Sequence, residues 1–180
     1  MDDDLLRAQR ADAARSLLAK EPHGLFAVLD AARDPRVLTM VGDTHLPMAS
    51  LYDGVLGDQL ADVAPYLVQL SHHDDFFDLL VSEAWGDSWG VFLRCDRVDF
   101  RDLRRHLRRF LRVRDEAGAR MLFRFYDPRV LRAFLPVCTV DEATQLFGPI
   151  DAFLVEGWEG ESLLRITQDA TGVRVASEPL

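Results

Sequence analysis

The chain has 180 residues, of which 48% are hydrophobic and 28% are charged, and its net charge is −9. This length and composition fit one soluble globular domain with a sizeable core. The absence of any run of about 20 apolar residues argues against a transmembrane helix. The acidic start Met1–Asp4 is unlike a secretory signal, which begins basic and continues apolar. We therefore expect a single cytoplasmic domain over residues 1–180 that makes no membrane contact.

The first half of the chain predicts alternating helices and strands. Residues 25–29 are a continuous apolar run, which predicts a strand buried on both faces. Asp74 or Asp75 is suited to cap a helix, because an aspartate side chain accepts a hydrogen bond from a backbone N–H of the first turn. The elements expected here are helices at 4–20, 35–40 and 74–84, strands at 25–29, 65–70 and 89–95, and loops over 42–58.

In the second half, Asp99 is suited to cap a helix over residues 99–111, whose apolar positions follow helical spacing. A hairpin is predicted over 113–126, with its turn near Ala117–Gly118 and alternating apolar residues in its second arm. Helices at 128–135 and 140–147 and strands near 150–156, 162–168 and 172–177 complete the pattern. This order predicts a single α/β domain with a mixed central sheet, flanking helices and antiparallel C-terminal strands.

One pentapeptide, Asp-Pro-Arg-Val-Leu, occurs twice, at residues 34–38 and 127–131. Each copy follows a segment that we predict to be a strand. Aspartate is a preferred N-cap, and proline fits the first helical position because its missing N–H has no partner there. We therefore predict the same strand-to-helix junction at both places, with the second strand running directly into its helix.

The two cysteines, Cys95 and Cys138, are too few for a disulfide framework, and in a reducing cytosol we expect buried thiols. Neither has the neighbours that a zinc site requires. His72 and His73 precede Asp74, but adjacent residues of a strand point in opposite directions and converge poorly on a metal. No phosphate-binding glycine loop is present. We therefore expect no metal and no cofactor.

Residues 86–90 match the G-x-S-x-G pattern of serine hydrolases, with Ser88 as the nucleophile. That pattern requires the serine to lie on a tight turn from a strand into a helix. Here a helix is predicted before the serine and a strand after it, and the nearest downstream histidine, His106, lies in an arginine-rich helix. We expect a structural turn and no enzyme; the alternative is a hydrolase that uses Ser88.

Positive charge is concentrated in the middle of the chain, since residues 94–132 carry 13 arginines against 6 acidic residues. The predicted helix at 99–111 contributes one arginine face: Arg101, Arg104, Arg105, Arg108, Arg109 and Arg112. Clustered guanidiniums require carboxylates or phosphates opposite them. We expect acidic surfaces of the same chain to meet some of them and an acidic protein partner to meet others. Nucleic acid is a further alternative, against which the acidity of the whole chain argues.

Six segments in order and spacing resemble the type VI secretion effector chaperones, also called adaptors, a family first catalogued as a domain of unknown function. The resemblance covers residues 20–150 and extends weakly to about 177. The segments are Leu25–Ala32, Ser50–Gly54, Ala61–Val68, Trp85–Phe92, Leu103–Leu111 and Phe123–Leu131.

The resemblance implies a cytoplasmic, non-enzymatic protein of a Gram-negative bacterium. Such a protein binds one cognate toxic effector and helps to mount it on the secretion spike, through the spike trimer or its tip protein. Matched positions have structural roles: Trp85, Trp89, Phe125 and Tyr126 in the core, and Asp127 and Pro128 at a helix start. Many relatives continue into a further helical lobe, and the resemblance implies that this chain, ending at Leu180, lacks it. Within this family the five residues Arg101, Arg104, Arg105, Arg108 and Arg109 are our candidates for binding the effector.

Overall fold

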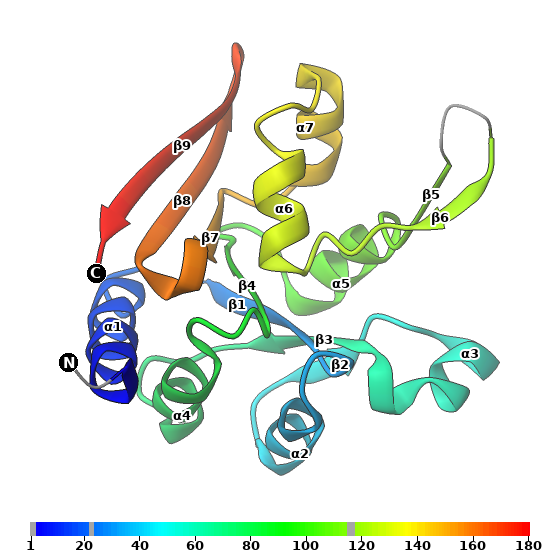
Figure 1. The fold of residues 1–180 in the computed structure, drawn as a ribbon. Coiled ribbons are helices and arrows are strands. Elements are labelled where there is room, and N and C mark those ends of the chain that lie inside the picture. Colours follow the sequence, from blue (N-terminus) through cyan, green and yellow to red (C-terminus); the bar gives the residue numbers. More distant parts are fainter. Residues whose placement is uncertain (1–2, 22–23, 115–117) are drawn as a thin grey trace.

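The structure, a computed structural model, describes residues 3–21, 24–114 and 118–180. Within these residues a seven-stranded sheet runs in the order β2-β3-β1-β4-β7-β8-β9, and every neighbouring pair is antiparallel (Figure 1). A separate hairpin pairs β5 with β6. The strands are β1 (Leu25–Asp30), β2 (Met48–Ser50), β3 (Pro65–Gln69), β4 (Gly90–Arg94), β5 (Arg112–Arg114), β6 (Arg120–Leu122), β7 (Ala152–Glu156), β8 (Ser162–Asp169) and β9 (Gly172–Pro179).

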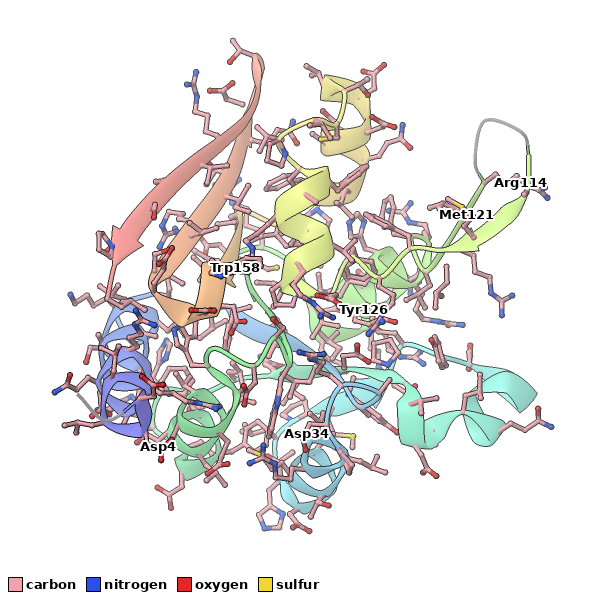
Figure 2. The ribbon with its side chains drawn as sticks, viewed as in Figure 1. Asp4, Asp34, Arg114, Met121, Tyr126 and Trp158 are labelled. Atoms are coloured by element: carbon pink, nitrogen blue, oxygen red, sulfur yellow. The ribbon has the colours of Figure 1, made fainter. Side chains whose placement is uncertain are left out.

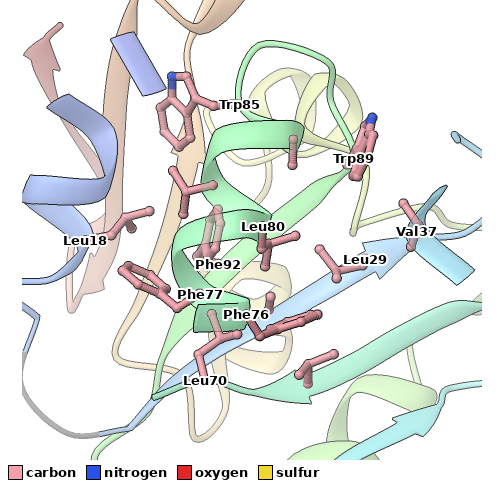
Figure 3. Close-up of a cluster of buried hydrophobic side chains, with 14 of the residues drawn as sticks. Leu18, Leu29, Val37, Leu70, Phe76, Phe77, Leu80, Trp85, Trp89 and Phe92 are labelled. Carbon is pink, nitrogen blue, oxygen red and sulfur yellow. The ribbon is translucent and has the colours of Figure 1, made fainter. Parts of the chain in front are cut away.

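Helices cover both faces of this sheet (Figure 1). On one face α1, α2 and α4 pack over one hydrophobic cluster, and on the other face α5, α6 and α7 pack over a second. Figure 3 shows the first cluster, in which Phe77 and Leu80 of α4 lie over the sheet. The helices are α1 (Asp3–Leu18), α2 (Pro35–Asp43), α3 (Gly54–Gln59), α4 (Asp75–Ala84), α5 (Phe100–Arg108), α6 (Pro128–Phe134) and α7 (Val140–Phe147), with short 3-10 turns at Ala61–Val63 and Trp158–Gly160.

The central strand β1 shows why its sequence is apolar throughout. Leu25, Ala27 and Leu29 belong to the first cluster, whereas Phe26 and Val28 belong to the second. Successive side chains of a strand point to opposite faces, so a strand covered on both sides needs apolar residues at every position. The prediction that this strand is buried on both faces is confirmed, as is the α/β class.

Most predicted elements are present within a few residues of their expected bounds. Asp34, Asp74, Asp99 and Asp127 all cap helices, and their side chains accept backbone N–H groups as expected. The helix predicted over 99–111 ends earlier, at Arg108. Of the predicted hairpin turn, Ala117 lies outside the described residues, as do Met1 and Asp2 of the acidic start.

Three predictions were wrong in part. The central sheet, predicted to be mixed, is antiparallel at every pair of neighbouring strands. The 42–58 region, predicted as loop, contains β2 and α3. The second hairpin arm, predicted as a strand to residue 126, ends at Leu122. Phe125 and Tyr126 instead form a turn and are buried in the second cluster. The aromatic residues that alternate in this part of the sequence are therefore buried in the core from a turn, and they do not belong to a paired strand.

None of the helices in the described parts of the chain is both long enough and apolar enough to cross a lipid bilayer. Across the same residues, histidine, cysteine and acidic side chains form no group of three that could hold a metal ion. Of the two cysteines, Cys95 is buried and Cys138 is half-buried, and neither forms a disulfide. Burial raises the pKa of the Cys95 thiol to about 12, so this side chain is protonated at neutral pH.

Candidate partner-binding surface

Helix α5 presents one buried face and one charged face. Asp99 caps it by accepting the backbone N–H of Asp102 at 2.8 Å. Leu103 and Leu107 pack into the second cluster beneath α5. Because a helix turns about 100° per residue, Arg101 and Arg105 lie on the side of α5 away from these leucines, whereas Arg104 and Arg108 are half-buried on its flank.

Arg101 and Arg105 are the exposed members of this set. Arg105 pairs with Asp102, one turn earlier, at 2.5 Å, and both side chains are more than half exposed. Surface pairs of this kind contribute little to stability because water and salt screen them. The Arg105 guanidinium can therefore exchange this local contact for a partner's carboxylate.

Arg104 and Arg108 act within the chain. Arg104 Nε donates to the carbonyl of Ser50 at 2.8 Å, and Arg108 Nε donates to the carbonyl of Leu51 at 3.1 Å. Arg108 also pairs with Asp53 at 2.7 Å. The backbone N–H of Gly54 and the charge of Arg108 hold the pKa of Asp53 below its usual value. Both arginines fasten segment 50–53 to α5, so substituting them tests local folding together with any binding.

Arg109 caps the end of α5, where its backbone N–H donates to His106 and Leu107 carbonyls. Its guanidinium lies 2.6 Å from His106 Nδ1, and His106 Nε2 lies 2.8 Å from the carbonyl of Leu146. Burial lowers the pKa of His106, and Arg109 lowers it further against the opposing Leu146 contact. These contacts fit a neutral imidazole that donates from Nε2 and accepts at Nδ1, which is a structural role.

A groove that the sequence did not reveal lies beside α5, between the 51–60 segment and the β5–β6 hairpin. Its apolar lining is Leu51, Tyr52, Leu60, Leu111 and Leu122, and its charged lining is Asp53, Arg108 and Arg112. Both bordering elements project from the same side of the molecule (Figure 1). The one sequence signal is the predicted hairpin, whose second strand β6 ends at Leu122 and which belongs to no larger sheet.

Ser88 lies between α4 and β4, so the predicted order of helix before strand is confirmed. It is buried, and its φ is +58°. Its hydroxyl and its backbone N–H each donate to Glu156 Oε1 at 2.9 Å, and the backbone N–H of Gly86 donates to Oε2 at 2.8 Å. Burial raises the pKa of the Glu156 carboxyl, which these hydrogen bonds oppose. The contacts tie the 86–88 turn to the end of β7.

The histidines and aspartates at 72–75 are placed at a helix start. Asp74 accepts the backbone N–H of Phe76 at 2.8 Å, which confirms it as the cap. His72 Nε2 lies 3.0 Å from the carbonyl of Glu21, and its ring meets Phe77 edge to face. These contacts give Asp74 and His72 structural roles in the fold.

The predicted structural residues are all buried in the described structure. Trp85 Nε1 donates to the carbonyl of Gly160 at 2.9 Å, and the guanidinium of Arg36 lies 4.6 Å from the Trp89 ring centre. Tyr126 is buried against Phe125, and its pKa is raised by burial, with Tyr52 as its hydrogen-bond partner. Figure 2 shows Tyr126 near the start of α6. Pro128 is buried as the first residue of that helix.

Sequence reasoning missed the buried acids that organise long-range contacts. Asp30, at the end of β1, is buried and pairs with Arg124, and Arg129 pairs with Asp127 at 2.7 Å. Glu21 is likewise buried, and it pairs with Arg165. Each pair except Asp127–Arg129 joins residues far apart in the chain, so no local pattern could have predicted it.

Comparison with known proteins identifies one family. A family model described as "Domain of unknown function (DUF4123)" matches residues 25–145, which is more than half of the chain. No curated protein and no solved structure matches significantly. The chain belongs to the DUF4123 family.

Proposed function

We propose that this protein is a cytoplasmic adaptor that binds one type VI secretion effector and helps to load it onto the secretion spike. The observation that carries the proposal is the coincidence of two findings on the same stretch of chain. The DUF4123 match covers residues 25–145, and the six segments that resemble the effector adaptors lie between Leu25 and Leu131.

The contacts of the candidate catalytic residues support a binding role. Ser88 donates to a buried carboxylate within a turn, and His106 is held by Leu146 and Arg109. Both side chains thus have structural partners. The exposed arginines of α5, by contrast, have few strong contacts to lose. Proteins that work by docking concentrate such arginines and aromatic anchors at their interfaces.

Co-expression tests the proposal. The tagged chain is co-expressed with candidate toxins encoded near its gene, and we expect it to elute together with one of them in size-exclusion chromatography. The same complex is then mixed with the spike trimer or the tip protein. In the bacterium, deletion of this gene should abolish secretion of that toxin while the spike itself is still secreted. A toxin that is secreted normally after the deletion would refute the adaptor function.

Ser88→Ala separates this proposal from the hydrolase alternative. We expect the variant to capture the effector as the wild type does, because Glu156 keeps its backbone donors at residues 86 and 88. A fluorophosphonate probe that labels the wild type but not Ser88→Ala would support a serine hydrolase. Salt-sensitive binding of an unrelated oligonucleotide would support a nucleic-acid module in its place.

A further inference from the structure

We propose that the groove between the 51–60 segment and the β5–β6 hairpin holds an amphipathic segment of the effector, whose apolar stripe fills the groove and whose acidic side chains lie along the arginine wall. This inference rests on the adaptor function proposed above and assigns it a surface and a ligand chemistry.

The apolar part of the groove has a buried floor and exposed walls. Leu51 and Leu111 form a buried floor, being 0% and 6% exposed, whereas Leu122 and Leu60 on the two walls are 53% and 37% exposed. When a partner covers exposed leucines that line a groove, apolar surface is removed from water and the free energy of the complex is lowered. The groove therefore favours a ligand with an apolar stripe.

The hairpin wall carries the positive charge. Arg112 lines the groove and pairs across the strands with Leu122. Because side chains of a strand alternate, Arg114 shares the face of Arg112, and both are exposed. Among the residues that the structure describes, Arg112 forms no ion pair with a carboxylate. This wall can therefore receive acidic side chains of a ligand.

The opposite wall, formed by the 51–60 segment, determines how a ligand is oriented in the groove. It carries Asp53, whose carboxylate is occupied by Arg108, and Asp62 is exposed two residues beyond Leu60. Because Arg108 is already paired with Asp53, this wall offers acidic side chains of a ligand no unpaired cation, whereas the hairpin offers Arg112. Arg101 and Arg105 add further exposed positive charge on α5, the helix that carries Arg108. Such charge complementarity sets the direction of docking and the rate of association.

The hairpin offers a matched pair of variants. Leu122 and Met121 are adjacent and are 53% and 49% exposed, but they point to opposite faces, and only Leu122 lines the groove. Figure 2 shows Met121 and Arg114 on the projecting hairpin. Leu122→Asp and Met121→Asp therefore make the same chemical change at similar exposure. Arg112→Glu is compared in the same way with Arg97→Glu, another exposed arginine, outside the groove.

The first probe is a fluorescein-labelled helical peptide of leucines on one face and glutamates on the other, measured by fluorescence anisotropy. We expect it to bind the wild type, and its affinity to fall at least tenfold with Leu122→Asp and Arg112→Glu. Met121→Asp and Arg97→Glu should change the affinity by less than twofold. Circular dichroism confirms that each variant is folded. Absence of binding to the wild type, or equal losses in groove and control variants, would overturn the inference.

A peptide with lysine in place of glutamate tests the charge, and equal binding of this peptide would refute the acidic ligand. An oligonucleotide that displaces the acidic peptide more strongly than the unlabelled peptide does would assign the surface to nucleic acid. Sedimentation in which the wild type is a dimer and Leu122→Asp a monomer would assign the groove to a second copy of the chain. Each of these outcomes contradicts the proposal.

The co-expressed effector separates this inference from the adaptor function. If the wild type captures the effector and Leu122→Asp does not, while Met121→Asp does, both proposals are supported. If all three capture it equally, the groove is wrong and the adaptor function stands. If no form captures the effector and deletion of the gene leaves secretion unchanged, the adaptor function itself fails.

Discussion

The two copies of Asp-Pro-Arg-Val-Leu build the same helix start in different surroundings. Asp34 accepts the backbone N–H, Nε and Nη2 of Arg36 at 2.8, 3.1 and 2.9 Å. Asp127 accepts the corresponding atoms of Arg129 at 3.0, 2.9 and 2.7 Å. These three hydrogen bonds need only the pentapeptide, because each of their donors and acceptors lies within it.

Burial distinguishes the two copies. The side chain of Asp34 is 23% exposed and that of Asp127 is 3% exposed. The fully buried apolar residue is Val37 in the first copy but Leu131 in the second, so the two helices are rotated by about one residue, roughly 100°. A pentapeptide therefore determines how a helix begins, while the rest of the chain determines which side of it meets the core.

The strongest test of this contrast is Asp127→Ala. We expect the free energy of unfolding to fall by about 3 kcal/mol, because the change removes a cap and leaves Arg129 and the first-turn N–H groups without a buried acceptor. Urea denaturation followed by circular dichroism measures the loss. A loss below about 1 kcal/mol would show that burial adds nothing to this cap.

A second variant, Arg124→Met, tests how the later copy is tied to the sheet. Arg124 pairs with Asp30 and also lies 4.0 Å from Asp127, and both acids are almost fully buried. We expect a loss of about 2 kcal/mol, because removing the cation leaves a buried carboxylate without its ion pair. The backbone N–H of Ala32 still donates to Asp30, which limits the loss.

The double variant Arg124→Met with Asp30→Asn provides the control for this ion pair. It should recover part of the stability, because both charges are absent. Additive losses in the double variant would show that the two side chains act independently.

Asp34→Ala should have a smaller effect, about 1 kcal/mol, as expected for a cap near the surface. Arg36 keeps its contacts with Glu83 at 2.7 Å and with the Trp89 ring after the change. Denaturation under the conditions used for Asp127→Ala allows direct comparison. Equal losses for the two aspartates would mean that local hydrogen bonds, and not burial, determine how much each cap contributes to the free energy of unfolding.

The distinction between local contacts and contacts with distant parts of the chain also explains which features the sequence predicted. The caps at Asp34, Asp74, Asp99 and Asp127 were predictable because an N-cap is a local contact. The structure of the 42–58 region was not, because Arg104 and Arg108 hold segment 50–53 from more than 50 positions away.

The candidate site follows the same rule. The arginines of α5 were visible as a charged helix face in the sequence. Their division into exposed residues, such as Arg101 and Arg105, and structural residues, such as Arg104 and Arg108, depends on which backbone carbonyls lie within reach. The groove was hidden for a similar reason, since its walls at Leu60 and Leu122 come together only in the folded chain.

The last prediction concerns the face of the sheet that holds the second copy. That face buries His106, whose pKa is lowered chiefly by burial. An unfolded histidine binds a proton near pH 6.5, whereas the folded one does so at lower pH, so the unfolded state takes up more protons as the solution is acidified. The free energy of unfolding should therefore decrease from pH 7.5 to 5.5.

His106→Gln should show a shallower pH dependence over this range, even though its stability at pH 7.5 is lower because the contacts with Leu146 and Arg109 are weakened. Hydrogen exchange at pH 6 should show protection decreasing first in α5 and α7, which His106 joins, and later in α2 beside Asp34. Identical slopes for the variant and the wild type would mean that other groups control the acid response. Uniform loss of protection would mean that the two faces of the sheet unfold together, so that the greater burial around the second pentapeptide does not make its face respond separately to acid.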